Sequence, residues 1–115
     1  MAITRIEAGP RMSQCVVSGD TVYLAGQVAD DPNADVKGQT QSVLSKIDAL
    51  LAKAGSSKSN LLSTVIYLSD MRHFEGMNQV WDAWVDAGNT PARATVAALL
   101  ARPAYLVEIM VVASK

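Results

Sequence analysis

Several residue types are scarce in this sequence, and each scarcity excludes a class of site. Cys15 is the only cysteine and His73 the only histidine among the 115 residues. A single cysteine excludes a disulfide within the chain and a metal site built on a cysteine pair. A lone histidine excludes RNA cleavage by a histidine pair, and the chain contains no glycine-rich phosphate loop. The sequence therefore predicts a protein that binds neither a metal ion nor a nucleotide cofactor.

An excess of charge of one sign and long apolar runs are also absent. Ten Lys and Arg residues balance eleven Asp and Glu residues to a net charge of −1, and the basic residues are scattered. This distribution lacks the basic stripe of a nucleic-acid surface, so we do not expect a nucleic-acid partner. No segment approaches about 18 uninterrupted apolar residues, and the first residues lack the apolar core of a signal peptide. We expect a cytoplasmic protein without membrane contact.

The chain is short, and a large share of its residues is apolar. Half of the residues are hydrophobic and 18% are charged, which fits a folded protein. The length predicts one domain spanning residues 1–115. Because a domain of this size has little interior, we expect another subunit to cover part of its apolar surface.

Hydrophobic periodicity predicts an alternation of strands and helices. Strands are predicted at 4–6, 14–18, 21–25, 61–68, 93–100 and 105–113, and helices at 38–54 and 71–87. Gly19-Asp20 is a hairpin signal, and Gly55 ends the first helix. Gly26-Gln27 interrupts the third strand, as a bulge or a close backbone approach does. The aromatic residues of the second helix, at helical spacing, are interpreted as core rather than as a platform for stacking a ligand or RNA base.

Two helices can cover only one face of the resulting sheet. An antiparallel strand with one solvated face normally alternates apolar and polar residues. The last strand instead carries apolar residues on both faces: Leu106, Val107, Ile109, Met110, Val111 and Val112. The second face is therefore predicted to pack against another copy of the chain, which makes the protein a homo-oligomer.

Glu108 is the exception in that apolar strand. A buried carboxylate is paired or neutralised, so a cation is expected nearby. Arg93, two residues after Pro91, is the best candidate, because a turn at Arg102-Pro103 would place position 93 opposite position 108 on adjacent strands. The pair can be an ordinary ion pair at a strand edge or subunit interface. Alternatively, the guanidinium can grip a planar carboxylate ligand in a pocket between subunits.

Other candidates have weaker signals. Asn78 lies one position off the core stripe of the second helix and is read as either a structural amide or a ligand contact. Cys15 is interpreted as a small buried apolar residue, because no nearby histidine activates it. His73 is predicted at the surface. Ser13 has no identifiable base, which argues against a serine hydrolase.

Taken together, these residues make the sequence resemble the RidA family, also called YjgF. The likeness spans nearly the whole chain, and the helix from Met77 to Trp84 is most similar to a less characterised branch of that family. The residues that carry it are Gly9-Pro10, Ser13-Gln14, Ala25-Gly26-Gln27, Gln39-Thr40, Ala54-Gly55, Leu68-Ser69-Asp70, Phe74, Met77-Asn78, Pro91-Ala92-Arg93 and Val107-Glu108-Ile109.

The resemblance implies a chorismate-mutase-like α+β fold, a mixed sheet with two helices on one face, and a homotrimer with three clefts between subunits. It also implies that Arg93 binds a substrate carboxylate and that Glu108 positions a water. That water attacks the imine form of a compound such as 2-aminoacrylate and releases a 2-oxo acid and ammonia. No metal or organic cofactor takes part.

Three pocket positions depart from the pattern of the deaminating members. Met12, preceded by an extra residue, Arg11, replaces a tyrosine; Ala25 replaces a serine; and Thr95 replaces a cysteine. With Asn78, these three are expected to surround the ligand. The main hypothesis is an enamine/imine deaminase, and the alternative, favoured by the departures, is a non-catalytic binder of small carboxylates such as 2-oxo acids. RNA cleavage, an activity attributed to some relatives, is disfavoured by the scattered basic residues and the lone histidine.

Overall fold

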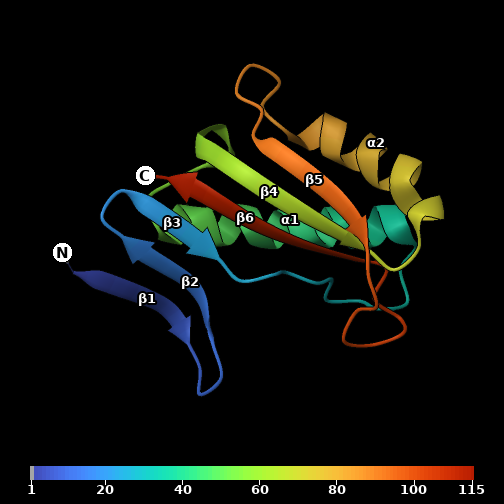
Figure 1. Cartoon of the computed structure of the whole chain (residues 1–115), viewed down its shortest axis with the longest axis horizontal. Coiled ribbons are helices and arrows are strands. Elements are labelled where there is room, and N and C mark those ends of the chain that lie inside the picture. The colour runs from blue at the N-terminus through green and yellow to red at the C-terminus, as the bar shows by residue number, and fades with distance from the viewer. Residues whose placement is uncertain (1) are drawn as a thin grey trace.

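The computed structural model describes residues 2–115 as one mixed sheet with two α-helices (Figure 1). The strands follow the order β1-β2-β3-β6-β4-β5 across the sheet. This arrangement confirms the α+β expectation. The elements are β1 (Ile3–Ala8), β2 (Ser13–Ser18), β3 (Thr21–Leu24), α1 (Val36–Lys53), the 3₁₀ turn η1 (Lys58–Asn60), β4 (Leu61–Leu68), the 3₁₀ turn η2 (Met71–His73), α2 (Phe74–Trp84), β5 (Ala92–Ala97) and β6 (Val107–Ser114).

The sheet combines consecutive hairpins with one parallel pair. β1, β2 and β3 pair antiparallel in chain order, and β6 lies antiparallel between β3 and β4. β5 pairs parallel to β4, with α2 as the connection between them. A parallel neighbour requires such a crossover, because a tight turn can join only antiparallel strands.

Helix α1 begins and ends at specific side-chain and backbone signals. The Asp35 carboxylate accepts a hydrogen bond from the Gly38 amide at 2.8 Å, which caps the first turn. At the other end, Gly55 has φ +78°, and the Ser56 amide donates to the Leu51 carbonyl at 2.8 Å. This is the Schellman arrangement that glycine favours. The helix predicted at 38–54 therefore forms and starts slightly earlier than expected.

Helix α2 is shorter than the predicted 71–87. The Asp70 carboxylate accepts a hydrogen bond of 2.9 Å from the Arg72 amide. This bond caps the η2 turn, which contains the residues predicted as the start of the helix. After Trp84 the chain becomes extended at Val85. The Asp86 carboxylate then accepts from the Gly88 amide at 3.1 Å, which forms a turn. Local side-chain hydrogen bonds therefore compete with the helix at both ends.

The strands predicted at 93–100 and 105–113 are observed as β5 and β6, but they do not form a hairpin. Strand β4 lies between them, and residues 98–106 pass from one side of β4 to the other. The buried Gln39 amide holds this link. Its nitrogen donates to the Ala104 carbonyl at 3.0 Å, and its oxygen accepts from the Leu106 amide at 2.9 Å.

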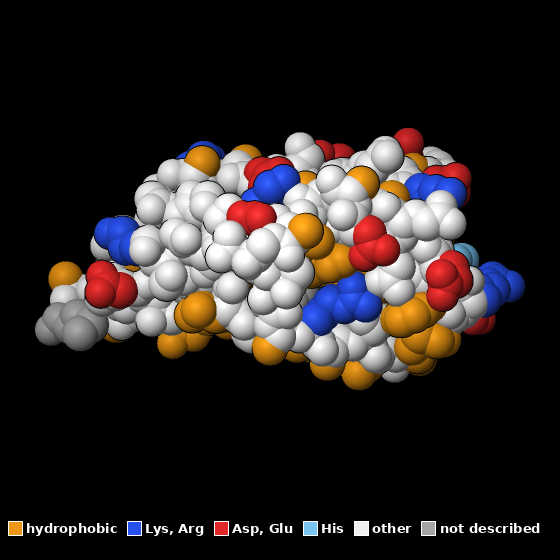
Figure 2. All heavy atoms as spheres, turned by 90° about the horizontal axis from the view of Figure 1, so that it is seen from above, with side chains coloured by type: hydrophobic (Ala, Val, Ile, Leu, Met, Phe, Trp, Pro, Cys, Tyr) orange, Lys and Arg blue, Asp and Glu red, His pale blue; other side chains and the backbone are white. Residues whose placement is uncertain are grey.

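The core lies between the helices and one face of the sheet, as predicted. In β6, Val107, Ile109, Val111 and Ala113 are buried on this face. The opposite face is uncovered by any described residue of this chain, and its exposed side chains include Tyr23, Val96 and Met110. The sheet face turned to the viewer in Figure 1 forms the lower edge of Figure 2, where hydrophobic side chains gather.

Candidate functional site

Arg93 lies on β5 with its guanidinium over an aromatic ring of α2. The Arg93 Cζ atom is 5.4 Å from the centroid of the Trp81 ring. The side chain is half-buried, and among residues 2–115 no carboxylate or hydrogen-bond acceptor pairs with its guanidinium. A ring face attracts the cation without using its N–H groups. The donors of Arg93 therefore remain available to an anionic ligand.

Three buried polar atoms that have no hydrogen-bond partner among residues 2–115 lie on the three elements next to this position. They are Thr64 Oγ1, Thr95 Oγ1 and Asn78 Oδ1. Thr64 is the register partner of Arg93 on β4, and Thr95 follows Arg93 by two residues on the same face of β5. Asn78 precedes Trp81 by three residues, so the two share one side of α2. We call these residues, with Arg93 and Trp81, the Arg93 cluster.

Unpaired buried polar atoms are unfavourable in a folded protein. Each costs about 1–3 kcal/mol unless a partner is supplied, and native proteins contain few of them. In the Arg93 cluster they come from β4, β5 and α2, the elements that also hold the free guanidinium. The cluster therefore has the chemistry of a site for a small anion that also forms hydrogen bonds.

Glu108 lies on the opposite face of the sheet, so the predicted pairing of Arg93 and Glu108 on adjacent strands is wrong. Glu108 alternates with the fully buried Val107 and Ile109 and is in register with Tyr67 of β4, whereas Arg93 is in register with Thr64. The two positions are separated by three residues along β4 and by two strand spacings, which amounts to roughly 14 Å. The sequence argument assumed a hairpin, but β5 is the parallel partner of β4.

The Glu108 carboxylate lies against the backbone of Gly26. A Cβ atom built on Gly26 would approach Glu108 Cδ to 2.9 Å and would lie closer still to its Oε2 atom. Gly26 follows β3, and the next residue, Gln27, exchanges backbone hydrogen bonds with Ile109 of 2.9 and 3.1 Å. The predicted interruption of the third strand is therefore a close approach of the Glu108 carboxylate to the Gly26 backbone, and a side chain at position 26 would require this carboxylate to move.

The predicted site residues thus fall into two groups within one chain. Thr95 and Asn78 belong to the Arg93 cluster. Ala25 follows the end of β3 and precedes Gly26, the residue that lies against Glu108; we call Glu108, Gly26 and Ala25 the Glu108 cluster. Met12, 53% exposed, lies in the turn between β1 and β2.

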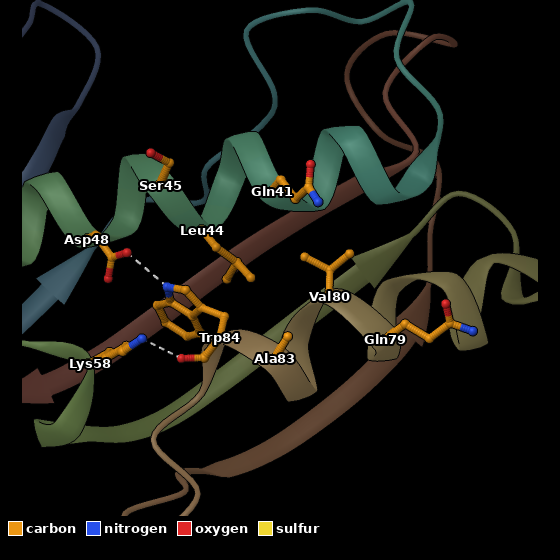
Figure 3. A pocket seen from close by; sticks show the side chains of 9 residues that line it. All are labelled: Gln41, Leu44, Ser45, Asp48, Lys58, Gln79, Val80, Ala83 and Trp84. Carbon is orange, nitrogen blue, oxygen red and sulfur yellow. Dashed lines mark hydrogen bonds between the residues drawn. The ribbon is translucent and has the colours of Figure 1, made fainter.

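A separate groove runs between α1 and α2 (Figure 3). It encloses about 430 Å³. The Trp84 indole nitrogen donates to Asp48 Oδ2 at 2.9 Å, and Lys58 Nζ donates to the Trp84 carbonyl at 2.6 Å. The residues that line it are Gln41, Leu44, Ser45, Asp48, Lys58, Gln79, Val80, Ala83 and Trp84.

The remaining candidates do not form a second reactive centre. Cys15 is fully buried, as predicted, and burial together with the nearby Glu7 carboxylate raises the pKa of its thiol, which disfavours the reactive thiolate. His73 is half-buried in η2 and its Nε2 atom has no hydrogen-bond partner, so its predicted surface position is only partly correct. Within residues 2–115, no group of His, Cys, Asp and Glu side chains is arranged to hold a metal ion.

Sequence reasoning missed three contributors to these clusters. Trp81 is 5% exposed and belongs to the core as predicted, yet it also presents a ring face to Arg93. Thr64 gave no signal, because a threonine in a strand is ordinary. Gly26 was recognised as a break in a strand, but the pattern did not identify Glu108 as the side chain that approaches it.

Comparisons with known proteins give a consistent result over the whole chain. The sequence matches the family described as Endoribonuclease L-PSP over residues 2–115. It is 46% identical over 114 residues to the RutC family protein YoaB of Escherichia coli K12, covering 99% of each chain. Its fold matches a solved member of the YjgF protein family from Neisseria meningitidis with a TM-score of 0.97 and 46% identity, covering 100% of this chain and 96% of the other.

A second solved structure, from Pseudomonas aeruginosa, matches with a TM-score of 0.96 and 42% identity, covering 99% of each chain. The fold expected from the sequence is thereby confirmed. In the described part of the chain, neither α-helix has the length and apolar character needed to cross a membrane.

Proposed function

We propose, from the premise that this chain belongs to the Endoribonuclease L-PSP family of YjgF, RidA and RutC proteins, that it deaminates small 2-imino acids. The substrates are reactive enamine or imine compounds related to 2-aminoacrylate, and the products are a 2-oxo acid and ammonia. The protein acts as a homotrimer, without a metal ion or organic cofactor.

One observation carries this proposal: the guanidinium of Arg93 is held on a ring face with its donors free, among three unpaired buried polar atoms. A guanidinium binds a carboxylate through two parallel hydrogen bonds, a geometry that a lysine does not offer. Thr64, Thr95 and Asn78 supply the polar atoms that the rest of a small imino acid requires. The substrate class is therefore a compact carboxylate with a polar group at the adjacent carbon.

Glu108 serves the reaction from a neighbouring subunit in this proposal. The two clusters lie on opposite faces of one sheet, so one chain cannot bring them to one ligand. The uncovered apolar sheet face, with Tyr23, Val96 and Met110, supplies a surface for subunit contact. In a cyclic trimer each interface joins two different patches, so the Arg93 cluster of one subunit can meet the Glu108 cluster of the next.

The chemistry requires orientation and one proton relay. Arg93 fixes the substrate carboxylate, which holds the electrophilic imine carbon in place, and this positioning supplies several kcal/mol of the barrier reduction. The Glu108 carboxylate accepts a proton from a water while the water oxygen bonds to the imine carbon and the electron pair of the C=N double bond moves to nitrogen. Glu108 then gives this proton to the nitrogen, which forms a carbinolamine. The carboxylate next moves the hydroxyl proton of the carbinolamine to the same nitrogen, the C–N bond breaks as the C=O bond forms, and ammonia leaves with the 2-oxo acid as the other product.

Non-catalytic binding of a small carboxylate is the second candidate. Ala25 and Thr95 favour it, because the resemblance leads us to expect a serine and a cysteine at these positions. In this case Arg93 still binds a 2-oxo acid, but turnover is absent. RNA cleavage has less support. Basic side chains are interspersed with acidic ones on the face seen in Figure 2 and form no stripe there.

The test generates 2-aminoacrylate in situ with a dehydratase and measures the release of ammonia and 2-oxo acid. We expect the wild type to exceed spontaneous hydrolysis and Arg93→Ala to remove the enhancement. Arg72→Ala is the matched control, because its side chain is 77% exposed and lies outside both clusters. A wild-type rate equal to the background would overturn the deaminase proposal. Calorimetry with 2-oxobutanoate then decides whether Arg93-dependent binding remains.

A further inference from the structure

Two tryptophans and two cations form a continuous stack from the groove between the helices to the Arg93 cluster. Arg93 Cζ lies 5.4 Å from the Trp81 ring centroid, and the Trp81 and Trp84 centroids are 5.4 Å apart with an interplanar angle of 51°. Lys58 Nζ lies 5.3 Å from the Trp84 centroid. The two rings therefore lie in contact with each other, and each ring also contacts one cation: Lys58 lies over Trp84, and Arg93 lies over Trp81.

Trp84 is fixed at both its ring and its backbone. Its indole N–H donates a hydrogen bond of 2.9 Å to Oδ2 of Asp48, a residue of α1. Its carbonyl accepts a hydrogen bond of 2.6 Å from Lys58 Nζ (Figure 3). Trp84 is also the last residue of α2, after which the chain turns away as an extended segment. These two hydrogen bonds anchor the end of α2 to α1 through Asp48 and to η1 through Lys58.

We propose that Trp84, anchored by Asp48 and Lys58, is a positioning residue that fixes the ring of Trp81 and, through that ring, the orientation of Arg93. The inference rests on the proposed function only in assigning a carboxylate to Arg93. It gives a role to Asp48 and Lys58, which lie in the groove outside both clusters. The groove between the helices is accordingly a second determinant of carboxylate affinity.

The contacts between the rings and the cations hold the Arg93 guanidinium in place without using its hydrogen-bond donors. An aspartate or glutamate beside Arg93 would hold the guanidinium but would occupy the donors that the ligand needs. A ring face holds the cation and leaves the donors free. The ring performs this role only if its own plane is fixed, and Trp84 supplies a tilted aromatic neighbour within the distance range of favourable ring pairs.

The test measures the affinity for 2-oxobutanoate by calorimetry in Trp84→Leu, Asp48→Ala and Asp48→Asn proteins. We expect Kd to rise about tenfold in Trp84→Leu and about threefold in Asp48→Ala, in line with the range of cation–π interactions. Asp48→Asn should restore the wild-type value, because an amide oxygen still accepts from the indole. Asp82→Asn is the matched control, since Asp82 is exposed on α2. In a deamination assay KM should rise while kcat changes little, because Glu108 is untouched.

A second measurement does not depend on ligand or turnover. The Arg93 Nε–Hε resonance should be displaced by the Trp81 ring in the wild type and should move toward the value of a free arginine in Trp84→Leu and Asp48→Ala. If the wild type neither binds nor turns over a carboxylate, the proposed function fails. The Arg93 resonance still shows whether Trp84 and Asp48 control the position of Arg93 over the Trp81 ring. Should Trp84→Leu not fold, Asp48→Ala carries the test. An unchanged Arg93 resonance and an unchanged Kd in Asp48→Ala would overturn the inference.

Discussion

At the residue scale, the Glu108 side chain occupies the space that a side chain at position 26 would need. A methyl group at this position would displace the Glu108 carboxylate, because the added Cβ would lie 2.9 Å from Glu108 Cδ. We predict that Gly26→Ala lowers kcat for deamination by at least about tenfold, a typical loss for a misplaced acid–base group. KM should change little, because the proposed carboxylate contact is made by Arg93 and not by Glu108. Steady-state kinetics measure both.

A double-mutant cycle separates this positioning effect from general damage. If Gly26 acts through Glu108, Gly26→Ala should have no further effect in a Glu108→Gln background. Gly88→Ala is the matched control, since the nearest atom to its added Cβ is 3.6 Å away. Additive losses in the double variant would contradict the role of Gly26.

The hydroxyl of Thr95 has no hydrogen-bond partner among residues 2–115, which makes its removal informative. We predict that Thr95→Val leaves the free energy of unfolding unchanged or raises it by about 1 kcal/mol, because an unsatisfied buried group is removed. Affinity for 2-oxobutanoate should fall about fivefold if that hydroxyl serves the ligand. Urea unfolding and calorimetry give the two values.

Thr40→Val provides the contrast. Thr40 is also buried, but its hydroxyl donates to the Val36 carbonyl at 2.7 Å, so its loss should destabilise the fold without changing the affinity. Unchanged affinity in Thr95→Val would remove Thr95 from the site.

The sequence alone indicated candidate residues for a site, but it did not indicate which residues lie next to them. Glu108 was singled out because a carboxylate inside an apolar strand needs a partner, and Arg93 because the turn at Arg102-Pro103 was expected to place it opposite Glu108. Their separation was not predicted, since it depends on which strand lies between them. Trp81 looked like core and is core; its second role is visible only when the guanidinium is placed over its ring.

At the element scale, periodicity predicted the six observed strands and both α-helices but not the order of the strands. The segment Leu61–Leu68 is observed with the bounds expected. The link 98–106 suggested a hairpin because a turn signal, Arg102-Pro103, lies between two strands. The parallel pairing of β5 with β4 overrides that local signal. Helix α2 provides the crossover that this parallel pairing requires. The hydrophobic pattern predicts that helix, but it does not show that β6 lies on the other side of β4.

Gln39 is the side chain that holds this link, and its removal tests the assignment. It is fully buried and bonds to Pro32, Ala34, Ala104 and Leu106 across the link and the loop before α1. We predict that Gln39→Ala lowers the free energy of unfolding by roughly 3 kcal/mol, because backbone groups lose their partners. Urea unfolding measures the loss. The exposed Gln41→Ala on the same helix should change it by less than about 0.5 kcal/mol.

At the scale of the whole molecule, the two faces of the sheet explain why one chain carries two incomplete clusters. One face is filled by α1 and α2, and the other leaves Tyr23, Val96 and Met110 exposed on a predominantly apolar surface. The apolar content of the last strand predicted that this face is covered by another subunit. The account places each complete site between two subunits, with Arg93 from one and Glu108 from the next.

Subunit complementation tests this central claim most directly. Arg93→Ala and Glu108→Gln chains are unfolded and refolded together, and deamination is compared with that of each variant refolded alone. In a cyclic trimer every mixed assembly contains one interface with both native residues, so equal mixing should restore about a quarter of the wild-type rate. Each variant alone should remain inactive. If mass spectrometry confirms mixed trimers but activity does not return, Arg93 and Glu108 do not form a shared site between subunits, and the account is wrong.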